Sequence, residues 1–158
     1  MEFLLRKRTE EDIEDFLTWK YEGVYSFYDN SIQQEKIDGY RQSVNKEQAL
    51  SVVNEFDELV GNCEFFDVSD DGEEEILAVG IQMKPSLTGK GHGSAFFRAI
   101  VEKGRSLFGY DHLELAVVDF NHRAIKVYER EGFQQIGEFM NEIRGDLYRF
   151  IIMAKDWR

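Results

Sequence analysis

The sequence predicts an α/β fold of the mixed type: one domain over residues 1–158, with a mostly antiparallel sheet of about seven strands and helices on both faces. The length of 158 residues is that of a single domain, and no repeat or linker divides it. Short alternating segments typical of strands are interspersed with segments of helical periodicity. A glycine-rich loop joins a strand to a helix in mid-chain, which is typical of parallel strands, whereas most other strands follow one another through short turns.

The N-terminal third is expected to form a strand and two helices. Residues 3–7 are predicted to be the first strand. Thr9 precedes three carboxylates, which is typical of a helix start because a hydroxyl caps free N–H groups and acids favour the positive end of the helix dipole. An apolar stripe follows at helical spacing: Ile13, Phe16 and Leu17. After an aromatic segment at residues 19–30, residues 31–41 are predicted to form a second short helix.

The middle of the chain is predicted to form three consecutive strands. Residues 49–56 and 58–66 alternate as antiparallel strands do, and a tight turn at Asp57 joins them. Residues 67–75 hold six carboxylates and one glycine, so we expect a solvent-exposed hairpin loop there. That loop leads into the strand at residues 75–83.

The second half is expected to alternate helices and strands. After the glycines of residues 89–93, a helical stripe ends near Gly109 and consists of Phe96, Phe97, Ile100, Val101 and Leu107. Residues 113–118 read as a strand. The next helix ends at Gly132 and is marked by Ala124, Ile125, Val127 and Tyr128. Two final strands at residues 133–140 and 147–154 leave an edge that could pair two copies in a homodimer.

Composition excludes several classes of protein. The net charge of -12 repels nucleic acid and anionic membranes, so neither is expected as a partner. Cys63 is the single cysteine, which rules out an internal disulfide or a CxxC metal site. The three histidines are not spaced as HExxH, so no metal is expected. No apolar run approaches ~20 residues and the N-terminus does not read as a signal peptide, so a cytoplasmic protein is expected.

The loop at residues 88–94 is the first candidate ligand site. Gly89, Gly91 and Gly93 alternate with other residues and let the backbone adopt positive φ close to a ligand. The following helix offers N–H groups without intrahelical partners and the positive end of its dipole, which suits phosphate oxygens. The GxGxG spacing matches neither the P-loop nor the Rossmann fingerprint. A plain turn before a capped helix is the alternative interpretation.

A second constellation follows about 30 residues later. Its spacing is LxVxxxNxxAxxxYxxxGF, formed by Leu115, Val117, Asn121, Ala124, Tyr128, Gly132 and Phe133. We interpret it as a strand, an Asn at its exit, a helix and a glycine stop, with Asn121 and Tyr128 two helical turns apart. Taken singly, Asn121 could be only an N-cap and Tyr128 only a core aromatic.

Together the two motifs resemble those of the Gcn5-related N-acetyltransferases, the GNAT superfamily. The family's R/Q-x-x-G-x-G/A pyrophosphate loop corresponds to residues 88–93, with Met83 and Pro85 at the usual preceding positions. Its N-x-x-A-x-x-x-Y-x-x-x-G-F stretch is met in full by residues 121–133. The resemblance covers residues 60–137 by motif and the whole chain by length and element order. Thr88 departs from the family's Arg or Gln, which weakens one polar contact to the pyrophosphate.

The resemblance implies acetyl-CoA as co-substrate and a primary amine of a small molecule or peptide as acceptor. It implies Tyr128 as the general acid that protonates the leaving thiolate. A backbone N–H near Met83 would stabilise the developing oxyanion. The cofactor contacts implied are Ile81, Met83, Thr88, Gly89, Lys90, Gly91, His92, Gly93, Ser94 and, for the pantetheine arm, Asn121.

The general base is the open role. Several relatives use a carboxylate on the strand before the glycine loop, but residues 76–83 contain none. Glu75 lies at the mouth of that strand and is the residue we assign, with Glu64 and Asp119 as other options. Surface solvation of all three, with a water chain as base, is the alternative.

Charge and aromatic content bear on the two substrates. Residues 84–130 hold eight basic and five acidic side chains, a net +3, so the rest of the chain carries -15. Such a division suits a phosphate-rich ligand on one side and a cationic amine on the other, although chance also produces such fluctuations. Tyr21, Tyr25 and Tyr28 could hold an alkylammonium by cation–π contact, with Glu22 or Asp29 as counter-charge. The alternative is that these rings only pack against the sheet.

Three functions therefore compete. The first is an acetyl-CoA-dependent N-acetyltransferase, favoured by Tyr128. The second is a non-catalytic acyl-CoA-binding regulatory module of the same fold, for which Thr88 and the missing strand carboxylate leave room. The third is an acidic scaffold protein whose glycine loop is only a turn, and which would have no affinity for CoA.

Overall fold

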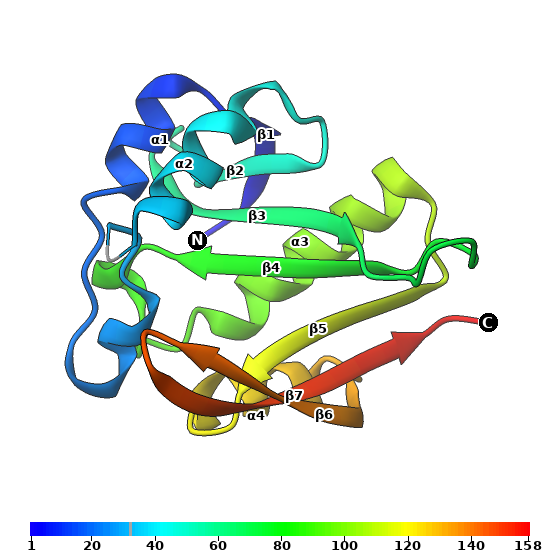
Figure 1. The fold of residues 1–158 in the computed structure, drawn as a ribbon. Helices are drawn as coiled ribbons and strands as arrows, with labels where there is room; N and C mark the ends of the chain where they lie inside the picture. Colours follow the sequence, from blue (N-terminus) through cyan, green and yellow to red (C-terminus); the bar gives the residue numbers. More distant parts are fainter. Residues whose placement is uncertain (32) are drawn as a thin grey trace. The chain divides into compact units, whose positions relative to one another are not determined.

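The computed structural model describes residues 1–31 and 33–158, and it contains the predicted order of strands and α-helices (Figure 1). The strands are β1 (Leu4–Lys7), β2 (Ala49–Val53), β3 (Leu59–Asp67), β4 (Leu77–Met83), β5 (His112–Val118), β6 (Gln134–Ile143) and β7 (Asp146–Asp156). The α-helices are α1 (Glu10–Phe16), α2 (Gln34–Gln42), α3 (Gly93–Phe108) and α4 (His122–Arg130). Three short 3₁₀ helices were not predicted: η1 (Gly23–Tyr28), η2 (Ser43–Asn45) and η3 (Pro85–Leu87).

The strands form one mixed sheet of seven strands in the order β1-β2-β3-β4-β5-β7-β6, which confirms the predicted fold class. The pairs β1–β2, β2–β3, β5–β7 and β6–β7 are antiparallel, and β4–β5 is parallel. The parallel register covers only Leu77↔Leu113 and Ala78↔Glu114, although β4 continues to Met83 and β5 to Val118. The chain divides into two compact units, residues 1–64 with 81–96 and residues 65–80 with 97–158, which are described separately below.

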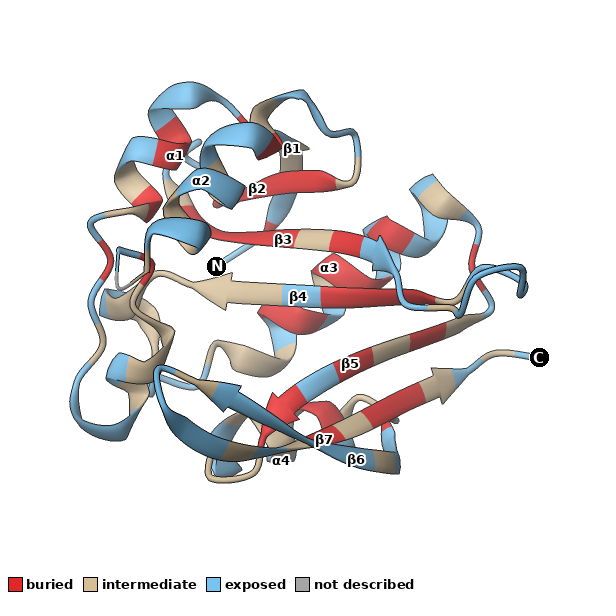
Figure 2. Cartoon of the chain, in the orientation of Figure 1, coloured by how far each residue is buried: buried red, intermediate tan, exposed pale blue. Residues whose placement is uncertain are grey.

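The first unit packs α1 and α2 side by side next to β1 and β2 (Figures 1 and 2). Thr9 caps α1 as predicted, in a reciprocal capping box with Asp12. Ile13 and Phe16 are buried with Trp19 in one apolar cluster, and the stripe's third member, Leu17, packs partly buried against it. The helix expected at residues 31–41 begins at Gln34, and residue 32 of that prediction lies outside the described residues.

Strand β2 ends at Val53, three residues before the predicted end. The side chain of Asn54 explains the early stop, because its Oδ1 accepts the N–H groups of Phe56 and Glu58 and closes a local loop. The turn residue Asp57 has φ 62°, in the left-handed region. The hydrogen bonds to the Asn54 side chain thus take the place of the backbone hydrogen bonds that would have extended β2.

The second unit has its core where α3 and α4 meet. The ring of Phe97 lies 4.7 Å from that of Tyr128 and 5.1 Å from that of Phe133. Leu107, which was predicted to belong to the apolar stripe of α3, is 50% exposed, so that part of the prediction was wrong. The buried face continues instead through Gly104, where a Cβ would lie 2.3 Å from Cζ of Phe65.

The last two strands form a longer hairpin than predicted. Arg144 and Gly145 connect them, with φ of 53° and 83°, the backbone of a two-residue hairpin turn. An Arg in the first turn position hides this signal, because Asn or Asp is usual there. Figure 2 shows β6, the edge strand of the sheet, exposed along nearly its whole length.

Candidate active site

The glycine loop has the backbone that its sequence predicts. Gly89 and Gly91 have φ of 71° and 84°, which side-chain-bearing residues rarely adopt. A Cβ at Gly91 would meet no atom within 4 Å, so the conformation rather than crowding requires glycine there. Helix α3 begins at Gly93, and its first turn points unpaired backbone N–H groups back toward the loop.

Ser94, in the first turn of α3, carries the observation that fits a phosphate ligand best. Its Oγ is buried and has no hydrogen-bond partner among the described residues. A buried hydroxyl without a partner costs free energy, since it gives up its hydrogen bonds to water. A ligand with oxygen acceptors at the helix N-terminus would satisfy it, which is the chemistry of a pyrophosphate.

The other loop side chains have local partners. Thr88 donates its hydroxyl to the carbonyl of Pro85 at 2.8 Å, so it closes η3. The ring of His92 lies edge-on to that of Phe3, 6.4 Å away, and Phe3 in turn packs on Phe96 at 5.4 Å. Lys90 is exposed. The loop therefore presents its backbone, and of its side chains Lys90 is the one that lies in solvent.

The end of β4 is held by residues from both sides. The N–H of Lys84 donates to the carbonyl of Val60 in β3 at 2.8 Å. In an extended strand the polar groups of successive residues point to opposite edges, so the N–H and C=O of Met83 point away from β3. At that edge the hydroxyl of Tyr21 donates to the Met83 carbonyl at 2.5 Å. Tyr21 is thus a residue that fixes the strand end on which the oxyanion donor was expected.

Tyr21 is itself firmly positioned. Its backbone N–H donates to Oδ1 of Asp29 at 2.8 Å. Burial raises the pKa of Tyr21 well above its usual range, despite a nearby amide of Gln82 that acts in the other direction. The hydroxyl therefore keeps its proton at any physiological pH and remains a donor. Asp29, expected as a counter-charge for the acceptor amine, also orders this turn.

Gln82 is a functional candidate that the sequence did not reveal. Its Oε1 accepts hydrogen bonds from Asn30, Tyr40 and Asn62, at 2.6, 3.0 and 3.1 Å. Its Nε2 donates to the Tyr28 carbonyl at 3.1 Å and to Asn30 Oδ1 at 3.0 Å. The only sign of its role in the sequence was a polar residue inside a strand of otherwise apolar pattern. The hydrogen-bond partners of Gln82 lie 20 to 54 residues away in the chain, so no local pattern includes them. Gln82 ties the aromatic segment and α2 to β4.

The remaining tyrosines of the aromatic segment lie on η1. Tyr25 and Tyr28 are both half-buried, and the ring of Tyr28 stands edge-on to that of Phe27, 5.1 Å away. The Tyr28 carbonyl also accepts from Nζ of Lys36 at 3.1 Å. The structure thus brings Tyr21, Tyr28 and the end of β4 together through hydrogen bonds, as parts of one unit.

The second unit holds the other motif. Asn121 caps α4, accepting the Ala124 N–H at 3.2 Å, and Tyr128 is 8% exposed with its ring against Phe97. Asn121 therefore acts as an N-cap and Tyr128 packs in the core, as the simpler interpretations of these residues predicted.

The carboxylates considered as base belong to different elements of the fold. Glu75 is exposed in the loop between β3 and β4. Glu64 is half-buried in β3, opposite Ala49 of β2. Asp119 follows β5 and lies 3.9 Å from Arg149. Across residues 1–31 and 33–158, no cluster of three or more His, Cys, Asp or Glu is arranged to hold a metal ion.

Comparison with known proteins identifies the class. The model of the acetyltransferase (GNAT) domain family matches residues 2–134. The chain therefore belongs to the GNAT acetyltransferase family, whose members use acetyl-CoA and acetylate amines, and the resemblance inferred from the two motifs is confirmed. No curated protein sequence matches the chain. None of the helices in the described part of the chain is long and apolar enough to cross a membrane.

Solved structures share the fold at low sequence identity. A GNAT-family acetyltransferase from Bacillus anthracis has a TM-score of 0.76 at 18% identity, covering 99% of this chain and 96% of that one. A putative phosphinothricin N-acetyltransferase has a TM-score of 0.76 at 19% identity, with 99% of each chain covered. Spermidine N-acetyltransferase from Vibrio cholerae, in complex with CoA and spermine, has a TM-score of 0.71 at 16% identity, with 99% and 96% covered. At these identities the likeness concerns the fold alone.

Proposed function

We propose that residues 1–158 act as one acetyl-CoA-binding domain that transfers the acetyl group to a primary amine of a small molecule or peptide. The buried, unpartnered hydroxyl of Ser94 at the start of α3 is the observation that carries the proposal. It lies directly after a loop whose two positive-φ glycines expose backbone N–H groups. The proposed pyrophosphate contacts are therefore the backbone of residues 89–94 and this hydroxyl.

The proposed chemistry is direct attack by the amine. Acetyl-CoA supplies an activated acyl group with a thiolate leaving group. The N–H of Met83, on the strand edge that Tyr21 fixes, stabilises the charge that develops on the carbonyl oxygen. The acceptor ammonium first loses a proton to water or to Glu75, and the neutral amine then attacks. Tyr128 gives its proton to the departing sulfur, and the second proton that leaves the amine nitrogen as the C–S bond breaks restores the Tyr128 hydroxyl. Of the residues proposed to act, Ile81, Met83 and the glycine loop belong to the first unit. Asn121 and Tyr128 belong to the second.

The acceptor is proposed to lie against the aromatic segment. Tyr25 and Tyr28 are half-buried, and the proposed cation–π contact uses their rings. Glu22 is exposed at the start of η1 and supplies negative charge there. The hydroxyl of Tyr21 is committed to Met83, so this residue can offer the acceptor only its ring.

A non-catalytic acyl-CoA-binding module is the second candidate. It is favoured by the exposed position of Glu75 and by the absence of a carboxylate on residues 76–83. Both candidate functions require bound acyl-CoA, so only a measurement of turnover distinguishes the enzyme from the module.

Two measurements test the proposal. Acetyl-CoA should raise the thermal midpoint, because a ligand of the native state must stabilise it. No rise would exclude both the enzyme and the module and leave the scaffold interpretation. A free-thiol assay over polyamines, aminoglycosides, amino acids and peptide N-termini then separates the two. Thiol release with one amine class supports the enzyme, whereas stabilisation without release from any amine supports the module.

A further inference from the structure

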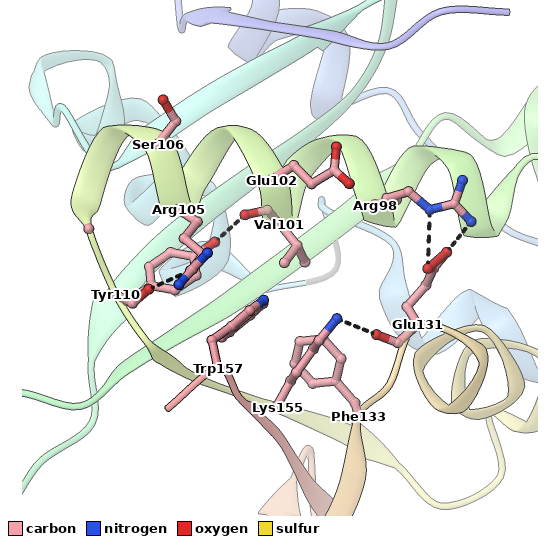
Figure 3. A pocket seen from close by; sticks show the side chains of 11 residues that line it. Arg98, Val101, Glu102, Arg105, Ser106, Tyr110, Glu131, Phe133, Lys155 and Trp157 are labelled. Carbon is pink, nitrogen blue, oxygen red and sulfur yellow. Dashed lines mark hydrogen bonds and ion pairs between the residues drawn. The ribbon is translucent and has the colours of Figure 1, made fainter.

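The second unit contains a groove that the proposed acetyl transfer does not use. It has a volume of about 670 Å³, within the range of small-molecule sites. It is lined by α3, by the segment after α4 and by the end of β7 (Figure 3). The charged residues of the lining are Arg98, Arg105, Lys155, Glu102 and Glu131, and no lining residue belongs to the glycine loop.

The floor of the groove is apolar and rigid. Val101, Tyr110 and Phe133 are each at most 8% exposed. The hydroxyl of Tyr110 donates to the Val101 carbonyl at 2.5 Å, which fixes the ring. The indole of Trp157 adds a wall, with its ring centre 5.7 Å from that of Tyr110. These surfaces suit a flat, apolar part of a ligand.

At one end of the groove Arg98 interacts with both acids of the lining. Glu131 is held by Arg98 through two hydrogen bonds of 2.5 and 3.2 Å (Figure 3). The hydrogen bond to Glu131 raises the pKa of Arg98, and the charge of Glu102 acts in the same direction. Both acids of the lining therefore act on Arg98, and neither is paired with another cation of the groove.

The other two cations of the groove contact one aromatic ring. Arg105 and Lys155 each lie 5.1 Å from the ring centre of Trp157. Within the described ranges, neither has a carboxylate oxygen within ion-pair distance. Nε of Arg105 donates to the Tyr110 carbonyl at 3.0 Å, and Nζ of Lys155 donates to the Glu131 carbonyl at 3.1 Å. Neutral carbonyls thus hold both cations in place without neutralising them.

Arg105 and Lys155 contact the same ring although the chain carries a net charge of -12. Like charges around one ring repel each other, and an anion bound beside them would lower that energy. Figure 3 shows the indole nitrogen of Trp157 at the end of the ring that faces α3. The groove therefore offers three hydrogen-bond donors around an aromatic floor.

From this arrangement we propose that the groove binds a small aromatic oxyanion, a ring that carries a phosphate or carboxylate group. The oxyanion is held by Arg105 and Lys155, and the ring rests against Trp157 and the apolar floor. Arginine favours such groups because its planar guanidinium can donate two parallel hydrogen bonds. The inference is independent of acetyl transfer, since it uses none of the residues assigned to that reaction.

The test uses phenyl phosphate, benzoate and inorganic phosphate as probes, titrated at constant ionic strength. Tryptophan fluorescence reports binding, and Trp157→Phe identifies its share of the signal, because the chain has only two tryptophans. We expect saturable binding of phenyl phosphate or benzoate, at least tenfold tighter than that of inorganic phosphate. The tighter of the two aromatic probes identifies the anionic group.

The double variant Arg105→Gln/Lys155→Gln should weaken the aromatic probe at least tenfold. Lys103→Gln/Arg130→Gln removes the same charge from exposed positions outside the groove and should leave binding unchanged. The single variants, each expected to weaken binding severalfold, replace the double variant if it does not fold. Equal affinity in both double variants, or a response that never saturates, would overturn the proposal.

Discussion

Removing one hydroxyl from Tyr21 tests whether the strand end at Met83 takes part in catalysis. Tyr21→Phe keeps the ring and deletes the 2.5 Å hydrogen bond to the Met83 carbonyl. A net hydrogen bond contributes about 1 kcal/mol, and a carbonyl left buried without a partner costs ~1–3 kcal/mol. For a chain of this size, about 1 kcal/mol lowers the thermal midpoint by ~2–4 °C.

The catalytic effect should be larger than this stability loss implies. Loss of a whole oxyanion donor costs about 10²–10³ in kcat. In Tyr21→Phe the Met83 N–H is still present but less well oriented, so we expect kcat to fall about tenfold, while the Kd for CoA changes less than twofold. The measurements are steady-state thiol release and calorimetric titration with CoA. A second signature is the carbonyl stretch of bound ¹³C-labelled acetyl-CoA, which should move toward its frequency in water as polarisation weakens.

Tyr110→Phe is the matched control. It deletes a hydroxyl that also donates to a backbone carbonyl at 2.5 Å, that of Val101, and its ring is 8% exposed. Both variants should lose similar stability, but only Tyr21→Phe should lose kcat. Equal kcat in the two variants, against an active parent protein, would refute the positioning role. An inactive parent would instead count against the proposed function itself.

Three further predictions follow from the same structure. Gly91→Ala strains a backbone at φ 84° and should weaken acetyl-CoA binding at least tenfold by calorimetry, whereas Gly72→Ala, at φ 82° in the acidic loop, should lose stability alone. Tyr128→Phe should lower kcat about 10²-fold with unchanged acetyl-CoA affinity, and unchanged turnover would remove it as the acid. Burial would raise the pKa of Asp12, but hydrogen bonds from Arg6, Ser51 and the Thr9 N–H outweigh it and lower the pKa to about 2. Ionised Asp12 therefore contributes about 2 kcal/mol to the free energy of unfolding. The contribution is fully present above the unfolded pKa near 4 and is lost as pH falls toward 2, and urea titrations of Asp12→Asn should show no such loss.

Local sequence patterns were sufficient to predict most elements of the fold. Helix α1 begins directly after its N-cap Thr9, because the Thr9 hydroxyl and the Asp12 carboxylate each accept the other residue's backbone N–H. Such a signal lies within four residues of the sequence. Glycines at positive φ are equally local, since the backbone conformation itself selects the residue. Periodicity failed at Leu107, where the helix face is decided by Phe65, a residue 42 positions earlier that needs the space above Gly104.

The site was only partly predictable for a related reason. The aromatic segment was recognised as a candidate for the acceptor amine, but a pattern of rings does not say where a hydroxyl points. Tyr21 meets Met83 across 62 positions, and Gln82 meets Tyr28 across 54. Such contacts depend on the fold that brings the segments together, and the same residues in another register would be ordinary surface groups.

The contacts of Tyr21 change what the aromatic segment can do. A free tyrosine cage would adapt its rings to many cations, because each hydroxyl could turn toward solvent. Here Tyr21 is held at its hydroxyl by Met83 and at its backbone by Asp29, and η1 is held at the Tyr28 carbonyl by Gln82. Movement of the acceptor wall would therefore disturb the strand end that carries the proposed oxyanion donor. If the enzyme accepts several amines, their kcat values should vary more than their KM values, because a poorly fitting amine displaces Tyr21 and with it Met83. Amines that differ only in KM would show that wall and strand act independently.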